Sequence, residues 1–321
     1  MMVDQDVIEC LDRALAKRKR HRRLDLAEMP NNSLKALAVP CEQRAKKVVA
    51  LVNSRIPSEK RRQIHIVFCE DERYGAFAIC KQYDYIVLNI GIILRLLHFC
   101  ERMMDNPQLW PDVRPEAFRG FSVVSTFECF DLIVRHELAH LLLGHLAKDA
   151  QDAKHIQMVS QALEFAADGH SAIWGFEALR KREKVCCAPR GMVAEGYREF
   201  HHDALANYLC ALFFMFRMGD ERAPKEGKLA NASHPPAPMR FNVASIHLGE
   251  HFKRTGDKEA YDQLVRADTW ERGESTFAKV LDREPETGLK TLTMRKESEE
   301  HYNEISNLAP TMPRHWFGLA D

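Results

Sequence analysis

The sequence predicts an α+β fold that is mostly helical, with a small mixed or antiparallel β-sheet formed early in the chain. Residues 63–69 (QIHIVFC) alternate and are rich in β-branched side chains, which indicates a strand. Residues 75–79 and 85–89 predict two more strands, joined by a short polar connection. After residue 90 the apolar side chains recur mainly at helical spacing, which favours a helical remainder.

The helices follow from the same spacing. Residues 32–53 look helical, with an interruption expected at Pro40. Residues 219–236 are rich in Gly, Pro, Lys and Asn, and we expect a linker there. The other helices are expected at residues 90–104, 126–148, 154–184, 193–218 and 236–252.

Composition excludes several classes of protein. The 321 residues are 45% apolar and 29% charged, an ordinary globular mixture. The 46 Lys and Arg balance 46 Asp and Glu, whereas a nucleic-acid or membrane-surface binder normally carries a charge excess. Nine scattered cysteines without a CxxC pair do not suggest a disulfide framework. No signal peptide is visible, and the longest apolar stretch, 205–216, is too short to span a bilayer. We expect a soluble, reduced, cytoplasmic protein.

The motif that carries chemistry is His136-Glu137-Leu138-Ala139-His140, within the apolar helical run FECFDLIVRHELAHLLLGHL. Positions four apart on a helix lie about 40° apart around its axis, so both imidazoles face one side. That spacing allows two neutral histidines to bind one Zn²⁺. Glu137 is placed to act as general base on a zinc-bound water.

A catalytic zinc needs a third protein ligand, and two candidates follow the motif. His145 lies five residues past His140, about 140° further around the helix, and can face the same metal only if the helix ends there. Otherwise it is a histidine at a helix C-terminus beside Gly144. The better candidate is Glu164 on the next helix, in ALEFAADGHSA.

Asp168 lies one helical turn beyond Glu164, so the two carboxylates share a face. Asp168 can therefore accept the N–H of a zinc-bound imidazole, for which we expect His136. The alternative is an ordinary amphipathic helix with two exposed carboxylates.

These patterns resemble a known family. HExxH followed by ExxxD on the next helix resembles the gluzincin metallopeptidases, and ExxAD in particular is similar to the HtpX and CAAX-prenyl-protease group and its soluble relatives. That group has an edge strand, a second apolar strand and a helix start, which match 75–78, 85–89 and 91–93 here. A late HP(P)…R segment matches 233–236 with Arg240 downstream. Gly75 stands where the group has Asn, and no transmembrane helices are present. The wording HELAHLLLGH also looks like the soluble phage-exclusion (Lit-type) peptidases.

The resemblance implies a zinc-dependent metalloendopeptidase with one Zn²⁺ per chain, which hydrolyses peptide bonds of a protein or peptide substrate. It implies a zincin-like pair of active-site helices in a catalytic domain at 61–252, flanked by helical regions at 1–60 and 253–321. An extended substrate would pair with the early edge strand by β-augmentation. The strand residues concerned are Gly75, Ala76, Phe77 and Ala78.

The donor to the oxyanion is less defined. His234 is the first candidate, with Arg240 positioning it or the substrate, but His-Pro-Pro is equally typical of a segment that starts a helix. Tyr197 and Tyr208 are further candidates. Cys186 and Cys187 form a pair in a loop bounded by Pro and Gly, where a thiolate could cap the zinc, or the pair is incidental.

Two functions of other classes compete. A catalytically silent zinc-containing scaffold could bind a partner through its terminal helices, although a structural site does not need a general base at Glu137. The basic run KRKRHRR at 17–23 would serve a nucleic-acid-associated regulator, or it is the solvated end of a first helix. We expect no membrane partner, and the sequence does not define an oligomeric state.

Overall fold

The computed structural model describes residues 5–17, 21–29, 32–58, 61, 63–109, 115–145, 153–187, 194–219, 235–266, 269–282 and 303. Residue contacts group the chain into two compact units. The first includes Met1–His98 and Ile133–Ala150, and the second includes Phe99–Leu132 and Gln151–Met312. Neither expected domain boundary, at residue 60 or at residue 252, coincides with a boundary of these units, and the three-part division stays a prediction.

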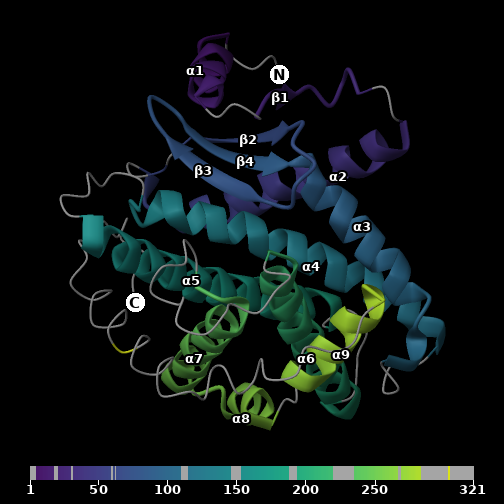
Figure 1. Ribbon diagram of the computed structural model, residues 1–321. Coiled ribbons are helices and arrows are strands. Elements are labelled where there is room, and N and C mark those ends of the chain that lie inside the picture. Colours follow the sequence, from purple (N-terminus) through teal and green to yellow (C-terminus); the bar gives the residue numbers. More distant parts are fainter. Residues whose placement is uncertain are drawn as a thin grey trace. The chain divides into compact units, whose positions relative to one another are not determined.

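The first unit contains a mixed four-stranded sheet, which confirms the predicted fold class (Figure 1). Its strands are β1 (Arg23–Leu24), β2 (Ile64–Cys69), β3 (Ala76–Cys80) and β4 (Asp84–Asn89). Their order is β1-β2-β4-β3. β2 and β4 run parallel, whereas the β1–β2 and β3–β4 pairs are antiparallel. Three strands fall where the sequence predicted them, and the two-residue β1 begins at Arg23, the last residue of the basic run.

Helix α1 (Gln5–Ala16) covers one face of this sheet (Figure 1). Its apolar side chains, including Val7 and Leu11, form one buried cluster with Tyr85 and Val87 of β4. The Tyr85 hydroxyl donates a hydrogen bond of 2.8 Å to the carbonyl oxygen of Val7, which satisfies a polar group inside the cluster. Helix α2 (Asn32–Asn53) contacts β2 of the same sheet.

Helix α4 (Pro115–Leu142) begins earlier and ends earlier than predicted. Proline lacks the N–H that the first helical turn would leave without a partner, so Pro115 is suited to start the helix. The preceding elements are helix α3 (Ile90–Met104), as predicted, and a short 3-10 helix, η2 (Pro107–Leu109). Every residue of 128–143 is buried. Such a helix is part of the core, so its polar side chains need partners.

The described part of the second unit is helical. Helix α5 (Ala153–Cys187) contacts α6 (Ala194–Gly219) and α7 (Ala237–Thr255). Gly169 allows the close approach of α5 to α7, because a Cβ there would lie 2.6 Å from the His247 ring. The predicted apolar stretch 205–216 lies in α6 and is almost wholly buried. Two shorter helices follow α7 in this unit, α8 (Lys258–Arg266) and α9 (Thr269–Val280).

Two local expectations were wrong. Pro40 lies inside a continuous α2 rather than at an interruption. Helix α5 continues through Cys187, so the cysteine pair belongs to a helix end rather than to a loop. Among the residues described, no helix is both long and apolar enough to cross a membrane.

Candidate metal centre

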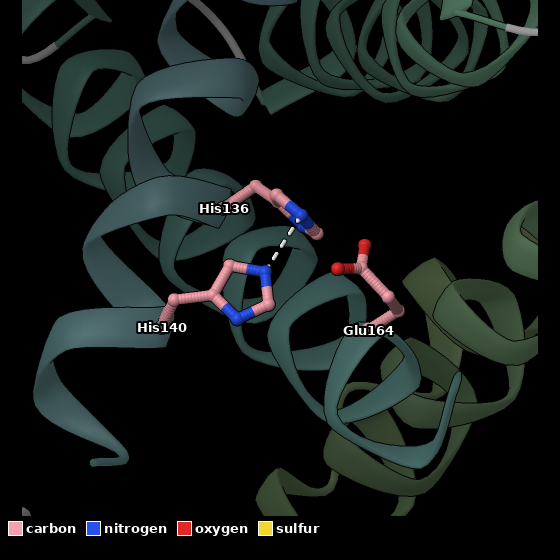
Figure 2. A group of neighbouring side chains, drawn as sticks. All are labelled: His136, His140 and Glu164. Atoms are coloured by element: carbon pink, nitrogen blue, oxygen red, sulfur yellow. Dashed lines mark hydrogen bonds between the residues drawn. The ribbon is translucent and has the colours of Figure 1, made fainter. Parts of the chain in front are cut away.

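Helix α4 places the two histidines of the HELAH motif on one face. His136 and His140 are both buried, with 6% and 8% of their surface exposed. Their rings are nearly perpendicular, and their Nε2 atoms lie 3.1 Å apart (Figure 2). The helical spacing therefore brings one nitrogen of each ring to the same point, as the sequence predicted.

The third member is Glu164 of α5, which is also buried. Figure 2 shows its carboxylate pointing towards the two imidazoles. One ligand atom from each of His136, His140 and Glu164 lies within 4.8 Å of the other two. This buried group could hold a metal ion, and it is the group of three that the sequence predicted.

The chemistry of these donors fits zinc. Two imidazoles and one carboxylate form a common catalytic zinc ligand set, and each nitrogen lies about 2.0–2.1 Å from a tetrahedral ion. Two such nitrogens are then about 3.3 Å apart. The observed Nε2–Nε2 distance of 3.1 Å is close to that value. Zinc remains a proposal, because other divalent ions accept the same donors.

Arg240 of α7 connects two carboxylates of α5. It donates hydrogen bonds of 2.8 and 2.7 Å to the two oxygens of Asp168, which is fully buried. The same guanidinium lies 3.4 Å from a carboxylate oxygen of Glu164 and stacks over the ring of Phe216. The planar fork of arginine suits such bidentate pairing. Arg240 thus fixes the α5 face that presents Glu164. Its predicted role, the positioning of His234 or of the substrate, stays a prediction.

The partner that the structure gives Asp168 differs from the predicted one. The sequence analysis assigned its carboxylate to the imidazole of His136, whereas both oxygens accept hydrogen bonds from Arg240. The reason is a contact between distant segments, since α7 packs against α5. The hydrogen bond from His136 to Asp168 stays a prediction.

Glu137 follows His136 directly in α4 and has 7% of its surface exposed. A carboxylate buried to this degree requires a compensating charge or hydrogen bonds. Its position in the chain places it next to the buried group, where the sequence analysis expected a general base. That role stays a prediction.

The sequence analysis left the place of His145 open, either as a metal ligand or as a histidine at the end of the helix. Helix α4 ends at Leu142, and the His145 Nδ1 lies 2.9 Å from the Nδ1 of His140. His145 therefore faces the nitrogen of His140 that points away from His136, and not the group of three ligand atoms. The Gly144-His145 sequence after the apolar run was the available signal.

Of the three candidates for the oxyanion donor, the structure describes the side chain of Tyr208 alone. The Tyr208 hydroxyl is buried and donates a 2.6 Å hydrogen bond to the carbonyl oxygen of Ala172. This bond belongs to the helix packing and argues against Tyr208 as the alternative oxyanion donor. His234 lies outside the described residues. The side chains of Tyr197, Cys186 and Cys187 also lie outside the described part of the chain.

Strand β3 lies at one end of the sheet order, next to β4 alone among the described strands. Backbone hydrogen bonds join Asn89 N to Gly75 O and Lys81 N to Tyr83 O, each 3.1 Å long. Because antiparallel strands alternate their pairing groups, the odd-numbered residues of 75–81 face β4. The N–H and C=O of Ala76 and Ala78 then point to the outer edge. This placement agrees with the predicted edge strand, while its use by a substrate stays a prediction.

Comparison with protein families, with curated proteins and with solved structures finds no match for this chain.

Proposed function

We propose that this protein is a zinc-dependent metalloendopeptidase of the gluzincin type, related to the HtpX and CAAX-prenyl-protease group or to the Lit-type peptidases. The observation that carries the proposal is the convergence of His136, His140 and Glu164, whose ligand atoms lie within 4.8 Å of one another. The two histidines lie on a buried helix, α4, that also carries Glu137. A buried cluster of three such groups needs a compensating ligand more than a surface cluster does.

His136, His140 and Glu164 would hold one Zn²⁺ per chain. Bound zinc supplies Lewis acidity, which makes water a stronger nucleophile and polarises a peptide carbonyl. Glu137 would take a proton from the attacking water as the C–O bond forms, and would then pass it to the nitrogen of the leaving amine as the C–N bond breaks. The charge of Arg240 keeps the Asp168 and Glu164 face of α5 in place.

An extended protein or peptide substrate would bind along β3. The outward N–H and C=O groups of Ala76 and Ala78 can pair with a substrate backbone in the manner of an added strand. Such pairing holds a scissile carbonyl in position without reading side chains. Gly75 lies just before this edge, and its carbonyl oxygen accepts a hydrogen bond from Asn89 N of β4. A Cβ at Gly75 would lie 3.2 Å from the Asn89 side chain.

The compartment that fits this proposal is the cytoplasm. The cysteines that the structure describes are free thiols, and most of them are buried, as expected in a reducing compartment. Neither a membrane nor a nucleic acid is proposed as a partner. The part of the basic run that the structure describes includes Arg23 in β1, which lies 3.9 Å from a carboxylate oxygen of Asp12 and 4.0 Å from one of Asp25.

The second candidate function is a catalytically silent zinc-containing scaffold. It would need the three ligands but not the carboxylate of Glu137. The two functions separate when wild type and Glu137→Gln are incubated with cell lysate and new peptide N-termini are identified by mass spectrometry. If the protein is a peptidase, new peptide N-termini should appear with wild type and not with Glu137→Gln, although both proteins should contain zinc. Identical termini in the two samples would exclude Glu137 as the base, and no new termini with wild type would favour the scaffold.

A further inference from the structure

The end of α4 has a defined backbone geometry. Gly144 has a positive φ of 69°, and its N–H donates to Leu141 O at 3.3 Å. The N–H of His145 reaches back to His140 O at 3.0 Å. These two bonds form a Schellman motif, in which a glycine adopts the left-handed conformation and the chain reverses over the last helical turn.

This reversal brings the His145 ring against the back of His140. The two ring centroids are 5.0 Å apart with an interplanar angle of 72°, and the Nδ1 atoms are 2.9 Å apart. That distance is typical of a hydrogen bond, and one of the two nitrogens must be the donor. Had the helix continued, His145 would have faced another direction, so the Gly144 turn creates the contact.

We propose that His145 is a positioning residue that orients His140 for metal binding and fixes its tautomer. A neutral imidazole carries one N–H and one lone pair. If the Nδ1 of His140 donates to His145, the lone pair of His140 is on Nε2, beside the Nε2 of His136. If the donation ran in the opposite direction, the Nε2 of His140 would carry a proton and could not bind a metal.

The inference rests on the proposed metal centre and adds a part to it. Histidine ligands of metals usually donate their second N–H to an acceptor, which sets the ring orientation and the basicity of the ligand. The acceptor here is the Nδ1 lone pair of His145, which requires the His145 proton on Nε2. His145 is thereby excluded as a ligand through the same nitrogen.

The first test reads the tautomer in metal-free protein, at a pH where both imidazoles are neutral. Long-range ¹H–¹⁵N NMR of ¹⁵N-histidine protein should show His140 protonated at Nδ1. In His145→Ala the fixed tautomer should give way to a mixture of the two forms. An Nε2-protonated His140 in wild type, or an unchanged tautomer in His145→Ala, would overturn the proposal.

The second test measures zinc affinity by competition with a chelator. His145→Ala should weaken zinc binding about 10–100-fold, which is the usual effect of losing such a partner. His145→Asn should recover most of the affinity, because the amide oxygen occupies nearly the place of the lost Nδ1 and can accept the same proton. His98→Ala, at an exposed position of α3, is the matched control and should bind as wild type does.

The outcomes separate this proposal from the proposed function. Wild-type affinity in His145→Ala, or equal losses in His145→Ala and His145→Asn, would overturn the positioning role while leaving a zinc peptidase intact. A wild-type protein that binds no zinc would overturn both. If the wild-type protein binds zinc but has no peptidase activity, the proposed function alone is overturned. Neither the NMR tautomer nor the zinc affinity depends on turnover.

Discussion

Arg240 should contribute more to stability than any exposed ion pair, because its partner has no access to water. Its guanidinium donates two hydrogen bonds, of 2.8 and 2.7 Å, to Asp168, whose side chain is 0% exposed. In Arg240→Met the aliphatic stem remains, but Asp168 loses its opposite charge. Breaking a buried pair by removing one partner costs about 3–5 kcal/mol, a large fraction of the roughly 5–15 kcal/mol that stabilises a typical domain.

The cost should depend on the remaining charge. In the double variant Asp168→Asn/Arg240→Met neither member of the pair is charged, so the free energy of unfolding should recover part of the loss, although the Glu164 carboxylate still lacks the arginine. Arg180→Met is the matched control. Arg180 is a partly exposed arginine that lies 3.4 Å from Asp257, and its removal should cost less than about 1 kcal/mol.

The assay is urea unfolding of metal-free protein, so that metal binding does not add to the free energy of unfolding. A loss below about 1 kcal/mol in Arg240→Met, equal to that of Arg180→Met, would contradict the reasoning. Strict additivity of the two single variants would contradict it as well, because a paired interaction requires a coupling term.

Three further predictions follow from other contacts. Burial against Phe176 and Phe252 lowers the pKa of His251. As the pH drops below about 6.5, the unfolded chain therefore binds a proton at His251 before the folded protein does, and the free energy of unfolding falls. In urea titrations at several pH values, His251→Gln should reduce that loss. Tyr208→Phe should lose about 1 kcal/mol of stability and keep its cleavage rate within a few-fold, since its hydroxyl bonds a helix carbonyl. Ala78→Pro should slow substrate cleavage while zinc affinity stays unchanged, because the substituted N–H faces the outer edge of β3; equal rates in Ala78→Pro and wild type would argue against substrate pairing there.

The sequence predicted those features that depend on local periodicity. The strand at Ile64–Cys69 and the helix at Ile90–Met104 follow from alternating and helical spacing, and their bounds agree within a residue. The pairing of His136 with His140 follows from helix geometry alone. The expected position of Glu164 needed one more assumption, that two consecutive helices present their polar faces to each other.

The features that could not be predicted depend on contacts or on single residues. Arg240 lies 72 positions from Asp168, and no periodic signal connects them. His145 depends on one glycine that ends a helix; a sequence pattern indicates such an ending but not the direction of the following ring. Pro40 looked like an interruption, yet neighbouring structure can hold a helix through a proline at the cost of one hydrogen bond.

Zinc content tests the central claim most directly. Elemental analysis of purified wild type and Glu137→Gln should give one zinc per chain in each, whereas His140→Ala and Glu164→Ala should lose most of it, with His98→Ala as the folded control. Full zinc occupancy in both His140→Ala and Glu164→Ala would contradict the account, because the metal would then be held elsewhere.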